Sequence, residues 1–355
     1  MRSSRTPLLA SGAVLAITTC LSAQEPEVVS GEVTCGDCFI TMDTVVTIGG
    51  LDGPGLHVVS LFSQVALDRG GRFLISATGH AEISVFDATG NFLQTVGRKG
   101  EGPGEYTSIR HIGVGPRYIH VFDYNAGRTM LDQGFAVVRT DRFPGSVTSA
   151  VIRSDDEVVF AGDVPTPESV GHQLHVLRPS GEFVSYGYDG EVYPSPLRMR
   201  SSSLTTVVVG NDDTVWLLPD RTNLLVRWDL GPAPRVGRVF ERRVAEFDAD
   251  TTRNNAAMLD DRGLWIIWHT RDPGWTRTKG GEFPSEPPRE WVDGWLDLAD
   301  PATGHTLARH HQEGAFLCFV AGSSYLVAYH EADAGIPFLH ILEPRLSRGS
   351  GAGKP

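Results

Sequence analysis

GRKGEGPGEY, residues Gly97–Tyr106, decides the fold, because four glycines and a proline in ten residues suit either a phosphate-binding loop or a corner between strands. A phosphate loop needs consecutive main-chain N–H groups and usually a helix behind them. Pro103 has no N–H, and the residues that follow, YTSIRHIGV, are typical of a strand. We therefore interpret the stretch as a link between two sheets, with Pro103 and Gly104 at the centre of a type II turn.

The same form, a strand that runs into a Gly-Pro-Gly corner, occurs earlier as VVTIGGLDGPG at Val45–Gly55. Downstream, a hairpin signature of apolar residue, polar turn and apolar strand recurs about every 50 residues, which is near the length of one propeller blade. Its six copies are LDRGGRFLI from Leu67, VGPRYIHVF from Val114, IRSDDEVVF from Ile152, VGNDDTVWLL from Val209, LDDRGLWII from Leu259 and VAGSSYLVAY from Val320.

A third strand, and often a fourth, follows each hairpin, as in AEISVFDATG at Ala81–Gly90 and FLQTVGR at Phe92–Arg98. One repeat is therefore four antiparallel strands. Such a sheet alone leaves two apolar faces open, so six of them must pack in a ring. The predicted fold class is all-β, a six-bladed β-propeller of four-stranded antiparallel blades.

The N-terminal strand Thr44–Gly49 lacks three preceding strands, and the last blade lacks a fourth. We expect this strand to close the ring by pairing with FLHILE, Phe338–Glu343. The predicted division of the chain is a signal peptide at 1–23, an N-terminal segment with a CxxC motif at 24–43, the propeller at 44–346 and a flexible tail at 347–355.

With its blade repeat, its export signal and its G-x-G-P-G-E-Y link, the chain resembles six-bladed β-propellers of the NHL and TolB-like kind, especially an exported bacterial group with that link. The resemblance covers roughly Thr44 to Leu346. It implies the architecture but no activity, because most of that group has no assigned reaction.

Export is indicated by Arg2 and Arg5, the apolar run Leu8–Ile17 and the polar, acidic start that follows. The run is too short to span a bilayer, and we expect no transmembrane span elsewhere. The mature protein is expected to be periplasmic or secreted. A lipid anchor at Cys20 is less favoured, because Thr19 replaces the usual Gly or Ala.

With 31 basic against 43 acidic residues, the net charge of -12 disfavours nucleic acid as a partner, although it does not exclude a local basic patch. We expect a monomer.

CGDC, Cys35–Cys38, predicts a local disulfide in an oxidising compartment. A redox-active pair would normally lie at a helix start, and a structural zinc needs four ligands. The third mature cysteine, Cys318, lies in the apolar AFLCFVAG and is expected in the core.

The segment Trp268–Trp295 interrupts the fifth blade between its second and third strands. In a propeller this connection shares a face of the disc with the links between blades, which we call the loop face. The segment predicts a ligand-facing or partner-facing lid, although its tryptophans could instead pack the loop onto the disc. The candidate binding residues are His269, Arg271, Asp272, Trp275, Trp291 and Trp295.

Other second-to-third connections add polar residues that we expect to be solvated, namely His80, Glu82, Asn125, Arg128, His172, Asp220, Asn223, His330, Glu331 and Asp333. There is no GxSxG and no HExxH motif. The predicted function is an exported binding or interaction module whose loop face takes an unknown protein, peptide or carbohydrate, with no catalytic residue, metal or cofactor predicted. The alternative is a metal-dependent, lactonase-like hydrolase or lyase that uses a divalent cation such as Ca²⁺.

Overall fold

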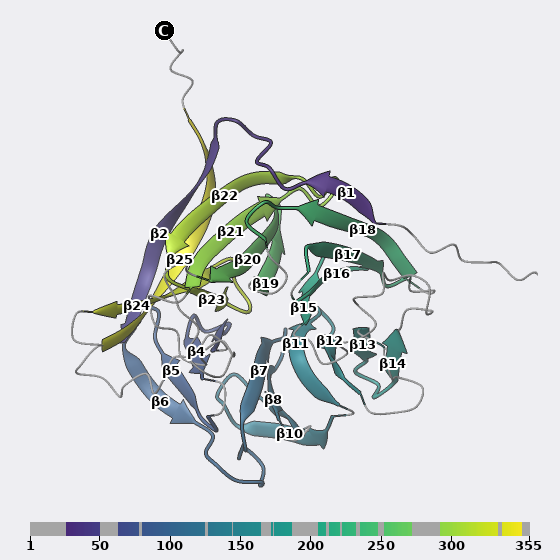
Figure 1. Ribbon diagram of the computed structural model, residues 1–355. Helices are drawn as coiled ribbons and strands as arrows, with labels where there is room; N and C mark the ends of the chain where they lie inside the picture. Colours follow the sequence, from purple (N-terminus) through teal and green to yellow (C-terminus); the bar gives the residue numbers. More distant parts are fainter. Residues whose placement is uncertain are drawn as a thin grey trace, which may run out of the picture.

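The computed structural model describes residues 26–49, 63–77, 80–124, 127–143, 145–164, 172, 174–186, 205–210, 213–220, 222–231, 235–247, 252–271, 292–332 and 336–349. The strands of this part of the chain form six sheets arranged in a ring (Figure 1). The predicted all-β, six-bladed propeller is confirmed.

Each blade begins with one of the six predicted hairpins, and its first strand lies innermost. Blade 1 comprises β3 (Gln64–Leu67), β4 (Phe73–Ser76), β5 (Ile83–Phe86) and β6 (Phe92–Val96). Blade 2 comprises β7 (Ile109–Val114), β8 (Ile119–Asp123), β9 (Gly127–Leu131) and β10 (Val137–Arg142). Blade 3 comprises β11 (Ser146–Ile152), β12 (Val158–Asp163), β13 (Leu174–Leu177) and β14 (Phe183–Tyr186).

The second half of the chain forms the remaining blades in the same order. Blade 4 comprises β15 (Thr205–Val209), β16 (Thr214–Pro219), β17 (Leu224–Asp229) and β18 (Arg235–Arg243). Blade 5 comprises β19 (Arg253–Asp260), β20 (Gly263–Arg271), β21 (Val292–Ala299) and β22 (Thr306–Glu313). Blade 6 comprises β23 (Phe316–Phe319), β24 (Leu326–Ala332), β25 (Ile336–Arg348) and the N-terminal β2 (Cys38–Gly49).

Second strands read as continuous apolar runs because each is covered on both faces by neighbouring blades. All four residues of β4 are buried, whereas the middle of the outer strand β6 is exposed. Successive residues therefore enter opposite seams between blades: Phe73 packs toward blade 6, and Leu74 packs toward blade 2. Six separate clusters of buried residues result, one at each seam.

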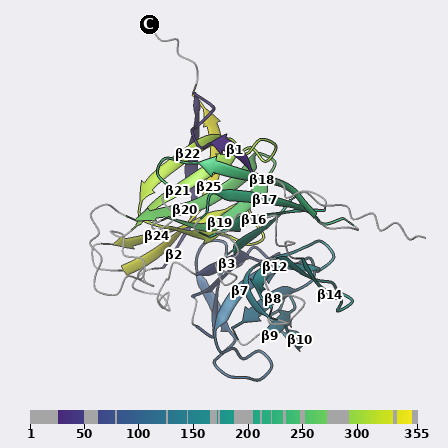
Figure 2. The same ribbon diagram turned by 45° about the vertical axis from the view of Figure 1, so that its right-hand side comes forward.

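The ring is closed by β2, which pairs antiparallel with β25 and joins the two ends of the chain (Figures 1 and 2). The predicted pairing is confirmed, with Val46 opposite Ile341 and Ile48 opposite Leu339. Val45 does not pair as expected, since it lies at a register shift and is 42% exposed.

Pairing between β2 and β25 continues beyond the predicted strand, as far as Cys38 opposite Arg348. The first two residues of the segment 347–355, expected as tail, are therefore strand residues of β25. Cys35 and Cys38 form the predicted disulfide where β2 begins.

Within the N-terminal segment 24–43, β1 (Glu27–Ser30) adds a fifth, parallel strand to blade 4 beside β18. Val29 is buried there. The chain then crosses blade 5, where the Thr34 N–H donates to the Thr306 carbonyl at 2.9 Å. The segment thus fastens the outer edges of blades 4 and 5 to the closing strand of blade 6.

The link Gly97–Tyr106 is a structural corner of the kind predicted. The Glu105 N–H donates to the Gly102 carbonyl at 2.9 Å across Pro103 and Gly104, and Gly104 has a φ of 76°. Tyr106 is buried in the seam between blades 1 and 2.

The predicted signal peptide, Cys20 and the predicted Gly-Pro-Gly corner at 53–55 lie outside the described residues. Within the part that is described, no helix is long and apolar enough to cross a membrane.

Candidate functional site

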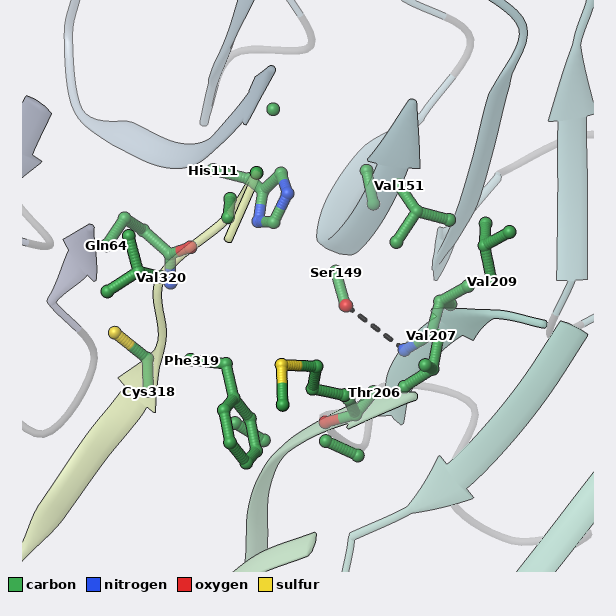
Figure 3. A pocket seen from close by; sticks show the side chains of 18 of the residues that line it. Gln64, His111, Ser149, Val151, Thr206, Val207, Val209, Cys318, Phe319 and Val320 are labelled. Carbon is green, nitrogen blue, oxygen red and sulfur yellow. Dashed lines mark hydrogen bonds between the residues drawn. The ribbon is translucent and has the colours of Figure 1, made fainter. Parts of the chain in front are cut away.

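A cavity of about 370 Å³ occupies the centre of the ring and is lined by residues of the innermost strands of all six blades (Figure 3). These strands are the free inner edges of the sheets, so the cavity is the central channel of the propeller. An edge strand presents main-chain N–H and C=O groups, which makes the channel a polar environment even between apolar side chains.

The channel has a polar end and an apolar end. All six inner strands start at the loop face, since each follows a link between blades. Their first residues in the lining include Gln64, Thr148, Thr205 and Asn254, whereas the last lining residues of four of the strands are Val114, Ile152, Val209 and Leu259. The channel is therefore polar toward the loop face and apolar toward the opposite face, which carries the hairpin turns and which we call the turn face.

Blade 6 departs from this pattern. Its lining begins with Leu317 and Cys318 in β23, and it ends with Gly322 and Ser323, which follow that strand. Cys318 is partly buried and packs against the core cluster between blades 6 and 1, as expected, and the residue also borders the channel. Burial nevertheless raises the pKa of its thiol to about 12, so the thiol is protonated at neutral pH.

A side-chain hydroxyl also accepts a hydrogen bond from a main-chain N–H at the inner edge of a blade. The Val207 N–H of β15 donates to Ser149 Oγ of β11 at 3.1 Å, which ties blade 4 to blade 3 at the channel wall (Figure 3). Between blades 6 and 1 the connection is made by main-chain hydrogen bonds. The Ala321 N–H donates to the Val65 carbonyl, and the Ala321 carbonyl accepts from the Leu67 N–H.

His111 gives the channel a group with a fixed protonation state. Burial lowers the pKa of its imidazole to about 4, against the opposing effect of a hydrogen bond to the Ala150 main chain. The ring is thus neutral at pH 7, and its Nε2 has no hydrogen-bond partner within the described structure. If the other ring nitrogen donates to Ala150, Nε2 is an acceptor for a ligand N–H or O–H.

Asn254 lies on the opposite side of the ring from His111 and is held rigidly. Its Nδ2 donates to the carbonyls of Pro219 at 3.1 Å and Thr222 at 2.6 Å, which leaves its side-chain oxygen as an acceptor. The donor and acceptor groups of the lining are therefore distributed around the channel.

Carboxylates, lysines and arginines are missing from the channel lining in the described ranges. In the same residues, the one cluster with metal-ligand spacing is Cys35, Asp37 and Cys38, and its two cysteines are joined as a disulfide. The channel lining that is described thus suits hydrogen bonding to a neutral ligand better than it suits holding a cation.

The candidate binding residues of blade 5 are only partly described, since Asp272, Trp275 and Trp291 lie outside the described residues. Arg271 is the last residue of β20 and pairs with Val292, the first residue of β21. It therefore lies at the base of the inserted segment, as its position in the sequence suggested.

His269 and Trp295 lie on opposite faces of blade 5. His269 is buried against blade 6, where it bonds to the Phe316 main chain, and burial lowers its pKa to about 4. Trp295 stacks on Trp268 toward blade 4, with ring centroids 4.9 Å apart. The structure does not bring these two side chains to one site, and their role as ligand contacts stays a prediction.

Two of the polar residues expected to be solvated are buried instead. Asp220 is 7% exposed, and so is Arg128, which forms two hydrogen bonds to Asp141 across β9 and β10. The sequence showed each as an isolated charge after a strand, without its partner.

The channel residues were not predicted from the sequence, because they lie within strands and not in the connections between strands. A signal was present, since each of the runs TSIRHIGV, SVTSAVI, TTVVV and NNAAML begins polar and ends apolar. In a ring of blades this pattern marks the two ends of a channel.

A family described as a 6-bladed beta-propeller, DUF5128, matches residues 60–160 of the chain. A Bacteroides fragilis protein described as exported has a similar structure, with 13% identity, a TM-score of 0.58 and coverage of 91% of this chain and 100% of its own. A DUF4221 family member from Bacteroides vulgatus is similar at 10% identity, with a TM-score of 0.59 and coverage of 88% and 99%. At these identities the likeness shows the fold alone, and no curated protein matches.

Proposed function

We propose that the protein is an exported binding module that takes a neutral ligand, a carbohydrate or a peptide segment, into its central channel from the loop face. The observation that carries the proposal is the change of the lining from polar at the loop face to apolar at the turn face. Hydroxyls, amides and the neutral His111 ring would bind the polar part of such a ligand at the entrance. The lid predicted from the tryptophan-rich insertion of blade 5 would lie over the same entrance.

Two observations support the export that this proposal assumes. The N-terminal sequence has the form of a signal peptide, and the Cys35–Cys38 disulfide suits an oxidising compartment such as the periplasm or the exterior. We expect the mature monomer to begin near Gln24. Mass spectrometry of exported material would contradict this if it found an intact Met1 or a lipid-modified Cys20.

The alternative is a metal-dependent hydrolase or lyase of the same fold. One observation favours it: the channel lining contains the amide groups of Gln64 and Asn254 and the imidazole of His111. Metal analysis of the purified mature protein, with assays of lactone turnover with and without added Ca²⁺, separates the two. Turnover that depends on stoichiometric metal would support the enzyme.

The binding proposal is tested by blocking the channel. Thr206 lies in the channel wall, so Thr206→Trp should fill part of the cavity (Figure 3). A thermal-shift screen of neutral sugars and short peptides on the mature protein would supply ligands, and calorimetry their affinities. We expect Thr206→Trp to weaken a channel ligand at least about tenfold, or about 1.4 kcal/mol.

The matched control is Thr95→Trp, which makes the same substitution on the exposed outer strand β6. It should leave affinity unchanged. Equal loss of affinity in both variants, or unchanged affinity in Thr206→Trp, would place the binding site outside the channel.

A further inference from the structure

A second cavity, of about 700 Å³, lies along the seam between blades 2 and 3 and shares no lining residue with the channel. Its walls come from β8, β9 and β10 of blade 2 and from the β13–β14 turn of blade 3. That turn, and the β11–β12 turn that carries Asp156, belong to the turn face. The two blades are neighbours in the ring (Figure 1).

The lining of this groove is basic, although the chain carries a net charge of -12. The lining contains five arginines and two aspartates, namely Arg117, Arg128, Arg139, Arg142, Arg178, Asp141 and Asp156. Such a concentration of one sign in a cleft focuses the field toward a ligand of the opposite sign.

The two aspartates do not neutralise the arginines. Asp141 is shared by Arg128 at 2.6 Å and Arg139 at 2.9 Å. Asp156 accepts from Arg117 Nε at 2.6 Å. Arg178 pairs with Glu182 at 2.7 Å and with Glu157 at 3.7 Å, both outside the lining. Among the described residues, Arg142 has no carboxylate within ion-pair distance, so its positive charge remains available at the groove.

His120 provides an observation that is independent of the arginines. Its ring is fully buried at the groove wall, and neither ring nitrogen has a hydrogen-bond partner among the described residues. The nearest acidic atom, Asp156 Oδ1, is 3.9 Å from Nε2, beyond hydrogen-bond distance. This oxygen has no hydrogen-bond partner among the described residues, whereas Oδ2 of the same carboxylate accepts from Arg117. Buried polar atoms of this kind are rare and call for a partner.

Asp156 has an energetically unfavourable backbone conformation. It has a φ of 66°, an uncommon conformation for a residue other than glycine. Strained backbone of this sort is found at ligand sites more often than elsewhere. In this fold it places a carboxylate between Arg117 and the unpartnered His120 ring.

An apolar wall completes the groove, formed by Phe143, Phe183, Leu177 and Met130. Phe143 is fixed by edge-to-face contacts with Phe122 and Phe160, with ring centroids 5.2 and 4.7 Å apart. A rigid aromatic surface next to guanidinium groups suits a ligand with both an apolar and an anionic part.

We propose that this groove binds a small ligand in which an oxyanion, a carboxylate, sulfate or phosphate, is attached to an aromatic or apolar body. Guanidinium groups that line the groove bind the oxyanion, the phenylalanines bind the body, and His120 hydrogen-bonds to a polar atom of the ligand. The volume lies in the range of about 300–1,000 Å³ that is usual for small-molecule sites.

The test uses the mature full-length protein near neutral pH and four probes in calorimetry: benzoate, phenyl sulfate, phenyl phosphate and the neutral benzyl alcohol, with inorganic phosphate as a fifth. At least one aryl oxyanion should bind with a Kd below about 1 mM, at least about tenfold tighter than benzyl alcohol and inorganic phosphate. The three aryl probes identify which oxyanion is preferred. If none of them binds tighter than both references, the proposal is wrong.

Arg139→Glu and Arg142→Glu place the charge change on exposed residues of an outer strand, where folding should be unaffected. Each should weaken the preferred aryl oxyanion at least about tenfold. The matched control is Arg235→Glu on the outer strand of blade 4, also exposed, which should change affinity less than about twofold. Equal weakening in the control would mean general charge attraction and would overturn the site.

A second measurement does not depend on any variant. The imidazole nitrogens of His120 can be followed by NMR with ¹⁵N-labelled protein, and their chemical shifts should move when the aryl oxyanion is added. Unchanged His120 shifts at saturating ligand would remove His120 from the site and contradict the proposal in this form.

Discussion

The seam between blades 6 and 1 and the seam between blades 2 and 3 occupy equivalent places in the ring but are built differently. In the described residues the first has thirteen buried apolar side chains, and the second has seven. The second instead contains buried histidines and the arginine-lined groove. Within blade 6 the closing strand β2 is held to β25 by pairing and packing, which favours a strongly apolar seam beside it. The seam between blades 2 and 3 has no such closing strand and contains polar groups.

Deleting Thr41–Gly50 should have the largest effect, because it removes most of the closing strand. The loss includes Val46 and Ile48, which are buried side chains worth roughly 1.5–3 kcal/mol each, and it exposes the edge of β25. Together these losses are a large part of the roughly 5–15 kcal/mol that stabilises a domain. We expect aggregated or protease-sensitive protein.

Deleting residues 350–355 is the control, since it removes none of the observed pairs of β25. That variant should unfold like the full mature chain in thermal scans. Cooperative melting of the Thr41–Gly50 deletion within a few degrees of the full chain would show that closure does not depend on β2.

Acid should weaken the seam between blades 2 and 3 before it weakens the closing seam. Three buried histidines with pKa values of about 4 belong to the seam between blades 2 and 3, namely His111, His120 and His175. Burial is the main cause of each lowered pKa. An unfolded histidine has a pKa near 6.5, so between about pH 6.5 and pH 4 the unfolded state binds protons that the folded state does not. The free energy of unfolding therefore falls as pH falls, by roughly 1.4 kcal/mol per pH unit for each histidine.

Hydrogen exchange, corrected for the intrinsic effect of pH on the rate, locates this loss. At about pH 5 the strands from β7 to β12 should lose protection before β2 and β25 do. His175→Gln keeps a donor for the Gly162 carbonyl and should reduce the loss on acidification. Earlier opening of β2 and β25 would contradict the assignment of acid sensitivity to the seam between blades 2 and 3.

Single substitutions within the closing strand sharpen the comparison. Ile48 is fully buried, so Ile48→Ala should lower the free energy of unfolding by about 2–5 kcal/mol. Val45 is 42% exposed at the register shift, so Val45→Ala should change it by less than about 0.5 kcal/mol. Urea unfolding of both variants measures the difference, and equal effects would mean that the register of β2 is wrong.

The features that the sequence predicted are local or periodic. Each hairpin is specified within about ten residues by a polar turn between apolar strands, and the closing strand follows from counting strands in the first and last blades. The strand β1 escaped prediction because EVVS is only four residues long and pairs with β18, more than two hundred residues away.

The sites were harder to predict for a related physical reason. A channel or groove is formed by side chains from several blades, and one sequence shows none of these contacts. Arg128 shows the limit: alone it looked like a solvated loop charge, but β10 brings Asp141 beside it and the seam buries Arg128. What a sequence can offer is the polar start and apolar end of each inner strand.

A local effect is expected where the closing strand begins. The disulfide between Cys35 and Cys38 encloses only four residues, so by loop-closure entropy it stabilises the fold by about 2 kcal/mol. Replacing both cysteines by Ser should therefore fray the first pairs of β2 with β25, near Cys38 and Arg348, and leave Ile48 protected. Hydrogen exchange measures both positions in one experiment, and loss of protection at Ile48 would show that the disulfide supports the whole closure.

Alkylation of the exported protein tests the disulfide itself, with Cys318 as an internal reference. Without reductant, neither Cys35 nor Cys38 should be labelled, whereas reductant should make both reactive. Cys318 should react slowly in the folded protein in either case, because burial raises its pKa to about 12 and little thiolate is present at pH 8. Labelling of Cys35 and Cys38 without reductant would mean that the strand is held by its pairing with β25 alone, and the loss expected from the double Ser variant would then disappear.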